Sequence, residues 1–217
     1  MRFKNKQEAL TYLLQACRQK NLLASGRVQE YVHHTPKKNY LLEKDFILLD
    51  PWEAEYLFRV AEMSKHNIVE LGRAFGGSTL LLAAATNSRI KSIDNAKSHK
   101  HDYFVTRINK LGFKNIDLYA DDSQKTRLSD GRFKYDLVFI DGDHSYEGVM
   151  ADMENWWDNL EPGGHYVLHD CHTGWKISHA VCEFIKDKNI IMHVPPVHNN
   201  KYYLHPYGSI CHFQKKL

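Results

Sequence analysis

The sequence predicts an α/β fold: a doubly wound, mostly parallel sheet of seven strands, with helices on both faces and a helical extension at the N-terminus. Short apolar segments of strand length alternate along the chain with helical segments of about 10 to 15 residues, the pattern of a parallel sheet covered on both faces. The chain has 217 residues, 43% of them hydrophobic, which is enough for one sizeable core. No repeat or low-complexity linker divides it.

The N-terminal part, residues 1–49, is predicted to be a helical and irregular extension. Leu10, Leu13 and Leu14 recur at helical spacing, which predicts an amphipathic helix over residues 4–24. The remainder of the extension shows no such periodicity. We expect the extension to cover the acceptor or to contact another subunit.

The main domain, residues 50–217, is predicted to open with a helix. Asp50 suits the N-cap and Pro51 the first helical position, so a helix is expected through Lys65. The predicted strands that follow are NIVELG, RIKSID, NIDLYA, YDLVFID, GHYVLHD, NIIMHV and GSICHFQ. The predicted helices are GGSTLLLAAAT, residues 97–111, a short polar helix after NIDLYA, SYEGVMADMENWWDNL and WKISHAVCEFIKDK. The letters EPGG are expected to form the turn that introduces GHYVLHD.

Charge and composition limit the partners. The 29 basic and 26 acidic side chains give a formal charge of +3, and the basic residues are scattered, so no nucleic-acid partner is expected. No apolar run approaches the ~20 residues of a membrane helix, and the N-terminus lacks the apolar segment of a signal peptide. None of the four cysteines forms a CxxC pair. Free thiols and a cytoplasmic location are therefore expected.

Acidic residues end every central strand of the predicted sheet. In such a sheet, ligands bind at the carboxyl ends of the strands, near the switch in strand order. Helix capping by aspartate would account for one or two of these residues but not for all. The residues are Glu70, Asp94, Asp121 with Asp122, Asp141 and Asp170.

Three glycines follow the first central strand. Gly72, Gly76 and Gly77 are spaced GxxxGG, which differs from the GxGxxG of dinucleotide binding and lacks the lysine of a phosphate-binding loop. The neighbouring Glu70 would repel a pyrophosphate but suits a cation. Asp94 ends the next strand roughly 20 residues on, where an acid takes the hydroxyl pair of a ribose.

The ordered motifs VELGRAFGGST, SIDNA, YADDSQ, DLVFIDGDHSYEGV and LEPGGHYVLHD resemble those of class I S-adenosylmethionine-dependent methyltransferases. Within that superfamily, IDGDHSYEGV followed by LEPGG and VLHD is most similar to the macrocin and macrolide-sugar O-methyltransferases and their cephalosporin-hydroxylase-like relatives. The resemblance covers residues 45–190. It implies a Rossmann-like methyltransferase fold and S-adenosylmethionine as the cofactor.

The resemblance also implies a set of cofactor contacts. The glycine loop would pass under the methionine part beside Ser78, for which an ordinary helix cap is the alternative. Asp94 would bind the ribose, and Asp122 and Ser123 would lie beside the adenine, with Asp121 as the alternative. The residues expected at the cofactor are Glu70, Gly72, Arg73, Gly76, Gly77, Ser78, Asp94, Asp121, Asp122, Ser123 and Asp141.

A divalent metal, Mg²⁺ or Mn²⁺, is implied at Asp141, His169 and Asp170. Relatives usually carry an acid at the first position of the last pair, where this chain has His169. An imidazole there can ligate directly and shift the preference towards Mn²⁺ or another transition ion. Alternatively, it stands behind the ligands and leaves two carboxylates and water. A divalent ion lowers the pKa of an acceptor hydroxyl, which an alcohol needs before methyl transfer.

His144 is the expected general base. It follows Asp141 by three residues at the start of a helix, and its ordinary pKa lies near neutrality. In the sugar-methylating relatives, the matching histidine resembles the base. A lone histidine of purely structural role is the alternative. Asp143 is expected to orient His144 or to cap the following helix.

The acceptor is expected to be a small molecule or glycan. The segment PPVHNNKYYLHPYG is rich in groups that suit a polar ring such as a sugar, although an ordinary surface loop explains it equally. Candidate acceptor contacts are His144, Trp175, Tyr202 and Tyr203. The sequence thus predicts a metal-dependent O-methyltransferase acting on a sugar hydroxyl of a glycan or glycosylated metabolite.

Three other functions stay open at this point. They are a catechol-type methyltransferase with a phenolic acceptor, a hydroxylase-like relative without methyl transfer, and a non-catalytic cofactor-binding module that regulates a partner. A homo-oligomer is compatible with each of them. Eight of the 14 histidines fall between residues 165 and 212, which fits either metal or substrate chemistry or scattered surface positions.

Overall fold

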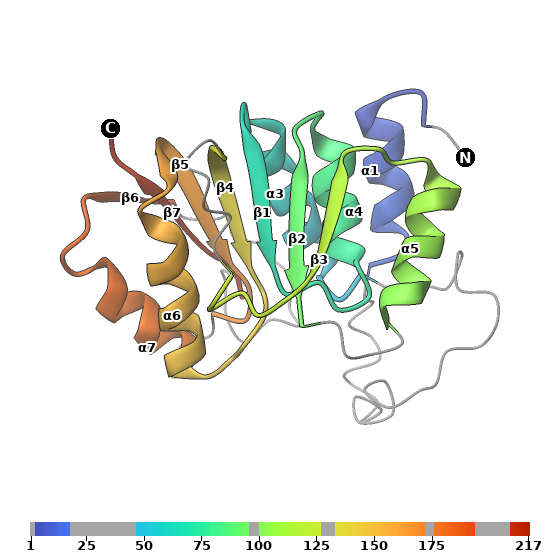
Figure 1. The fold of residues 1–217 in the computed structure, drawn as a ribbon. Helices are drawn as coiled ribbons and strands as arrows, with labels where there is room; N and C mark the ends of the chain where they lie inside the picture. Colours follow the sequence, from blue (N-terminus) through green and yellow to red (C-terminus); the bar gives the residue numbers. More distant parts are fainter. Residues whose placement is uncertain (1–2, 18–46, 96–99, 127–132, 172–175, 194–208) are drawn as a thin grey trace, which may run out of the picture.

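The computed structural model describes residues 3–17, 47–95, 100–126, 133–171, 176–193 and 209–217 (Figure 1). The strands are β1 (Asn67–Leu71), β2 (Ile90–Asp94), β3 (Ile116–Ala120), β4 (Tyr135–Ile140), β5 (Leu160–Leu168), β6 (Ile190–His193) and β7 (Cys211–Lys215). The helices are α1 (Lys6–Leu14), α3 (Pro51–Glu62), α4 (Gly77–Ala85), α5 (Lys100–Leu111), α6 (Tyr146–Trp157) and α7 (Lys176–Ile185).

The seven strands form one sheet in the order β3-β2-β1-β4-β5-β7-β6. All neighbouring pairs from β3 to β5 are parallel, whereas β7 runs antiparallel to both β5 and β6. The predicted doubly wound, mostly parallel sheet is therefore confirmed. The strand order reverses between β1 and β4, so the edge where ligands bind in such sheets lies at the carboxyl ends of these two strands.

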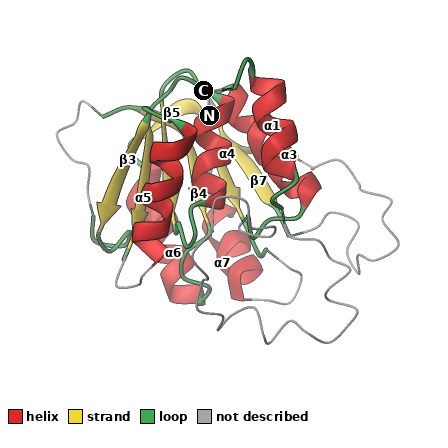
Figure 2. Cartoon of the chain, turned by 90° about the vertical axis from the view of Figure 1, so that its right-hand side faces the viewer, coloured by secondary structure: helices red, strands yellow, loops and turns green. Residues whose placement is uncertain are grey.

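Two apolar layers cover the sheet, one on each face. Side chains of β4 alternate between them: Leu137 and Phe139 join the layer with α1, α3 and α4, while Val138 and Ile140 join the layer with α6 and α7. Figure 1 shows α6 and α7 on one side of the strands and α3 and α4 on the other. Figure 2 views the molecule from the end where α1, α4 and α5 gather. Helices on both faces leave the strand ends as the place for polar chemistry.

Helix α1 packs in the same apolar layer as α3 and α4. Leu10 and Leu13 of α1 are fully buried in the layer with α3 and α4, and Cys17 pairs with Ile47 through an isolated bridge. The helix predicted over residues 4–24 is shorter in the structure: α1 ends at Leu14, and Cys17 already belongs to the bridge with Ile47. Residues 18–24 lie outside the described part. Among the described residues, no helix has the length and apolar composition that a membrane span requires.

Two further sequence-based element predictions differ from the structure. β5 begins at Leu160, not after EPGG, because Leu160 pairs with Tyr135. The next pair is Leu137 with His165, so the residues between Leu160 and His165 form an irregular stretch within β5. Gly163, at φ +80°, takes the left-handed conformation that this irregular stretch needs. The short polar helix predicted after β3 is a turn at residues 123–125, closed by the Thr126 amide on the Asp122 carbonyl at 2.8 Å, and residues 127–132 lie outside the described part.

Candidate active site

The loop between β1 and α4 passes directly over the end of β4. The Asp141 amide donates to the Leu71 carbonyl at 2.8 Å, which brings the two strand ends together. Gly72 has φ +89°, and a Cβ added to it would lie 2.2 Å from the carbonyl oxygen of Asp141. Gly76, the N-cap of α4, has φ +77°, and its Cβ would lie 2.0 Å from the ring of Phe104. Both glycines are therefore required by the close approach of their surroundings.

Glu70 supports this loop from beneath. Its carboxylate is fully buried and accepts hydrogen bonds from the hydroxyls of Ser78 and Ser92, each at 2.5 Å, and from that of Thr79. Burial raises the pKa of Glu70, and these three hydroxyls oppose that shift. The Ser78 hydroxyl lies inside α4 and faces Glu70, since the N-cap position belongs to Gly76. The direct cofactor contacts expected of Glu70 and Ser78 stay predictions.

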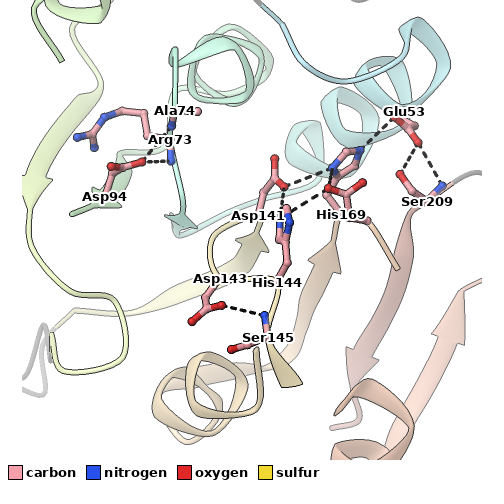
Figure 3. Close-up of polar contacts among 11 residues, drawn as sticks. Glu53, Arg73, Ala74, Asp94, Asp141, Asp143, His144, Ser145, His169 and Ser209 are labelled. Carbon is pink, nitrogen blue, oxygen red and sulfur yellow. Dashed lines mark hydrogen bonds and ion pairs between the residues drawn. The ribbon is translucent and has the colours of Figure 1, made fainter. Parts of the chain in front are cut away.

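Asp94 holds the loop from the neighbouring strand. Its Oδ2 accepts from the backbone amides of Arg73, at 2.8 Å, and Ala74, at 3.0 Å (Figure 3). Ala74 has φ +45°, a strained conformation for a residue other than glycine. The Arg73 guanidinium is buried and donates from Nη1 to the Ser92 carbonyl at 2.8 Å. Asp94 thus fixes the backbone of the loop at the place where the sequence predicts a ribose.

The expected adenine residues follow β3, beside the end of β2. The Asp121 amide donates to the Asp94 carbonyl at 3.1 Å, and Asp121 Oδ1 accepts from the Asp122 amide at 2.8 Å. The Ser123 carbonyl accepts from the indole Nε1 of Trp156 at 3.1 Å, which fixes this loop to α6. All three expected residues therefore lie at the same edge of the sheet as Asp94, and the structure does not separate Asp121 from Asp122.

Asp141, His169 and Asp170 come together at the ends of β4 and β5. His169 Nδ1 lies 3.3 Å from Asp141 Oδ1 and 3.5 Å from Asp170 Oδ2 (Figure 3). One nitrogen or oxygen atom from each of the three residues lies within 4.8 Å of the other two. Asp170 has φ +54°, so the backbone is held in a sparsely populated conformation beside the cluster.

Glu53 on α3 completes the surroundings of His169, and the sequence did not predict it. Its Oε2 lies 3.2 Å from His169 Nε2, and its Oε1 accepts from the amide and hydroxyl of Ser209 at 3.2 and 2.7 Å. Burial alone would raise the pKa of Glu53, but the contacts with His169, Ser209 and the Asp50 amide lower it to about 2. The capping box from Asp50 to Glu53 was visible in the sequence, yet no signal linked position 53 to position 169.

His169 therefore stands among three carboxylates. Burial disfavours the charged imidazole, but Asp141, Asp170 and Glu53 together raise the pKa of His169 well above its ordinary value. The three carboxylates therefore favour the charged form of His169.

His144 extends the cluster towards solvent. Its side chain is about half exposed, and its Nε2 lies 3.7 Å from Asp141 Oδ1 and 3.6 Å from Asp170 Oδ2. The hydrogen bond with Asp141 raises the pKa of His144, burial opposes this, and the charge of Asp170 adds to it. Asp143 Oδ1 accepts from the Ser145 amide at 2.8 Å in the turn before α6, whereas the N-cap of α6 is Ser145 and not Asp143.

A second buried acid that the sequence did not single out lies on α6. Asp152 is fully buried. Burial raises its pKa to about 6, the nearby Ser123 side chain opposes the shift, and the charges of Asp143 and Asp122 add to it. No signal in the sequence pointed to it, because the residues around it in MADME are typical of an ordinary helix. The three expected acceptor contacts Trp175, Tyr202 and Tyr203 lie outside the described residues.

Residues 69–171 match a family model whose description is a methyltransferase domain. This segment therefore resembles a methyltransferase domain. It contains the glycine loop, the ends of β1, β2 and β4, and the three residues of the carboxylate–histidine cluster. No curated protein matches the chain at a significant level.

Solved methyltransferase structures share the fold at low identity. A methyltransferase from Podospora anserina with S-adenosylhomocysteine bound superposes with a TM-score of 0.62 at 15% identity, covering 91% of this chain and 97% of that one. An S-adenosylmethionine-dependent O-methyltransferase from Thermotoga maritima gives 0.60 at 11%, covering 88% and 70%. An rRNA methylase from Streptococcus thermophilus gives 0.58 at 15%, covering 76% and 95%. The Rossmann-like methyltransferase fold is confirmed.

Proposed function

We propose that this methyltransferase domain moves a methyl group from S-adenosylmethionine to a hydroxyl oxygen of a sugar, in the manner of the macrocin and macrolide-sugar enzymes that its motifs resemble. The observation that carries the proposal is the meeting of two features at the switch in strand order. The loop held by Asp94 lies beside the cluster of Asp141, His169 and Asp170 (Figure 3). For transfer, the methyl donor and the activated hydroxyl must be held side by side, as a cofactor on this loop and a hydroxyl at this cluster would be.

The cofactor is proposed to lie along the ends of β1, β2 and β3. The backbone amides at the start of α4 are suited to its carboxylate, because a helix N-terminus attracts negative charge. Asp94 is assigned to the ribose, with Asp122 and Ser123, or Asp121, beside the adenine. The bound S-adenosylhomocysteine of the Podospora anserina relative supports this cofactor for the fold.

The residues present fit a divalent metal. Asp141 and Asp170 offer oxygen atoms, and His169 turns Nδ1 towards both of them while Glu53 holds Nε2. A carboxylate behind the far nitrogen is the usual support of a histidine ligand. These carboxylates favour a positive charge between them, which a divalent ion would supply. Mg²⁺ or Mn²⁺ held there would lower the pKa of an acceptor hydroxyl.

His144 is proposed to take the proton of that hydroxyl. Its Nε2 points into the same cluster, and its exposed side allows the proton to reach solvent afterwards. The Ser145 amide bond to Asp143 and the Ser145 N-cap of α6 fix the backbone on which His144 stands. A positioned base of this kind contributes about 10²–10⁴-fold to a rate.

The presence of a dedicated base distinguishes a sugar acceptor from a phenolic one. A sugar alcohol is much harder to ionise than a phenol, whose pKa lies near ~10, so a dedicated base is worth more for a sugar. The pairing of His144 with the carboxylate cluster therefore favours the sugar.

The test measures transfer of a labelled methyl group to a panel of sugars, glycosides and catechol, with Mg²⁺, with Mn²⁺ and with chelator. We expect metal-dependent transfer to a sugar, and loss of turnover in Asp141→Asn with S-adenosylmethionine still bound. The control Asp117→Asn, at a partly exposed position on β3, should keep full turnover. Turnover in chelator equal to that with metal would refute the metal. Preference for catechol would refute the sugar.

A further inference from the structure

Three histidines form a second cluster at the antiparallel edge of the sheet, away from the site described above. His165 lies on β5, His212 on β7 and His193 on β6, three strands that are neighbours in the sheet. His193 pairs directly with His212, and their rings stack with centroids 4.3 Å apart. His165 Nδ1 lies 2.9 Å from His212 Nε2. One ring nitrogen from each of the three lies within 4.8 Å of the others.

The protonation of His193 follows from its neighbour Gln214. The Gln214 amide nitrogen donates to the Gly163 carbonyl at 2.8 Å, and since a carbonyl only accepts, the other amide atom of Gln214 is the oxygen. That oxygen lies 3.1 Å from His193 Nε2, so Nε2 carries the hydrogen. In the neutral ring, Nδ1 of His193 then keeps a free lone pair, which is what a metal ligand requires.

His212 has the corresponding support on its far side. Its Nδ1 lies 2.6 Å from the hydroxyl of Tyr56 on α3, which leaves Nε2 towards His165. Histidine ligands of metals typically use one ring nitrogen for the metal and bond the other to a protein acceptor. Two of the three histidines therefore already have the outer contact of a ligand, through Tyr56 and through Gln214.

The environment keeps two of these rings uncharged. Burial lowers the pKa of His212 to about 3, with the nearby His193 and His165 adding to the shift. Burial and the nearby His193 lower the pKa of His165 as well. Only the neutral imidazole binds a metal.

We propose that His165, His193 and His212 bind one divalent transition ion of the zinc type, with water at the fourth position. Imidazole suits Zn²⁺ and its neighbours in the transition series, whereas Mg²⁺ prefers oxygen. Zinc–nitrogen distances of about 2.0–2.1 Å in a tetrahedron place two ligand nitrogens about 3.3 Å apart. The 2.9 Å between His165 and His212 needs to widen by only a few tenths of an ångström. The His193 ring stacks on that of His212, so one of these two rings must turn to bring both in-plane lone pairs to the same ion.

This site is distinct from the proposed active site. His165 precedes His169 by four residues on the same extended segment, which separates them by roughly 13 Å at the rise of a β-strand. The ion would join three strands, and β6 is the edge strand of the sheet, so its expected role is to fasten β6 and β7 to β5. Methyl transfer does not depend on it.

The test uses Co²⁺ as a spectroscopic probe on the chelator-treated full chain. Tetrahedral Co²⁺ gives strong visible absorption, unlike the six-coordinate ion. We expect this absorption, at one equivalent, in the wild type and in Asp141→Asn, and its loss in His193→Gln and His165→Gln. The exposed His179→Gln on α7 is the matched control and should absorb as the wild type does.

A second variant separates an outer contact from a direct ligand. Tyr56→Phe should keep the tetrahedral spectrum but weaken zinc binding about 10–100-fold, because the outer contact of His212 is lost. Unchanged circular dichroism of the metal-free variants would show that they fold. No tetrahedral absorption in the wild type, or absorption that survives in His193→Gln, would overturn the proposal.

Discussion

Glu53→Gln tests the link between α3 and the carboxylate–histidine cluster. Glu53 is buried, and its pKa falls from 4.5 to about 2 in the folded protein, mainly through the contact with His169. A depression of this size corresponds to about 3 kcal/mol of folding free energy at neutral pH. A glutamine keeps an oxygen for Ser209 but removes the charge that faces His169. Because Asp141 and Asp170 still stabilise the imidazolium, we expect a loss of about 2–3 kcal/mol.

The assay is urea unfolding of the metal-free protein, followed over a range of pH. The pKa of Glu53 is lower in the folded than in the unfolded chain, so its contribution is complete above pH 4.5 and declines as the pH falls towards 2. The difference between wild type and variant should therefore narrow on acidification. The matched control is Glu55→Gln, two residues away on α3 and exposed, which should change the free energy of unfolding by less than ~0.5 kcal/mol.

The same variant carries a prediction for the metal. If His169 is a ligand, removing the carboxylate behind it should weaken Mn²⁺ binding about 10–100-fold, as measured by calorimetry. A free energy of unfolding equal to the wild type at pH 7, or a difference that does not change with pH, would refute the reasoning about Glu53.

Three further predictions concern the loop, α6 and the base. Gly72→Ala should cost about 3 kcal/mol or more in urea unfolding, since its Cβ meets backbone at 2.2 Å. Gly163→Ala has a similar φ, but its Cβ makes only ordinary contacts, the nearest at 3.5 Å, so it should cost only about 1 kcal/mol. Equal costs would contradict the close approach at Gly72. The free energy of unfolding of Asp152→Asn should rise by about 2–3 kcal/mol relative to that of the wild type between pH 4 and pH 8. The pKa of Asp152 is about 6 in the folded protein and lower in the unfolded chain, so the wild type loses stability as the pH rises through this range. A difference that does not change with pH would refute this. His144→Gln should lower kcat about 10²–10⁴-fold and remove the acid limb of the pH–rate profile. An unchanged profile would exclude His144 as the base.

The sequence predicted what depends on local patterns and on the edge where parallel strands end. Apolar runs of strand length gave the central strands, and their last residues placed Asp94 and Asp141 at one edge of the sheet. The start of β5 was missed because Pro162 and the glycines after it are typical of a turn, while pairing with β4 decides the strand. Local patterns do not include such pairing.

Contacts between distant elements were beyond prediction for a related reason. Glu53 and His169 are 116 residues apart, and only the packing of α3 on the sheet brings them to 3.2 Å. The histidine cluster requires β7 to lie between β5 and β6, an order in which the last strand enters antiparallel. An excess of histidine in this region was visible, but not which members meet.

Binding of S-adenosylmethionine tests the central claim most directly. Calorimetric titration into the chelator-treated protein should show binding in the micromolar range. Asp94→Asn should weaken it at least about tenfold, through loss of the ribose contact and of a charged acceptor for the loop amides. The partly exposed control Asp117→Asn should bind as the wild type does. No binding by the wild type, with or without Mg²⁺ or Mn²⁺, would contradict the account. Equal binding by Asp94→Asn would show that the cofactor lies elsewhere.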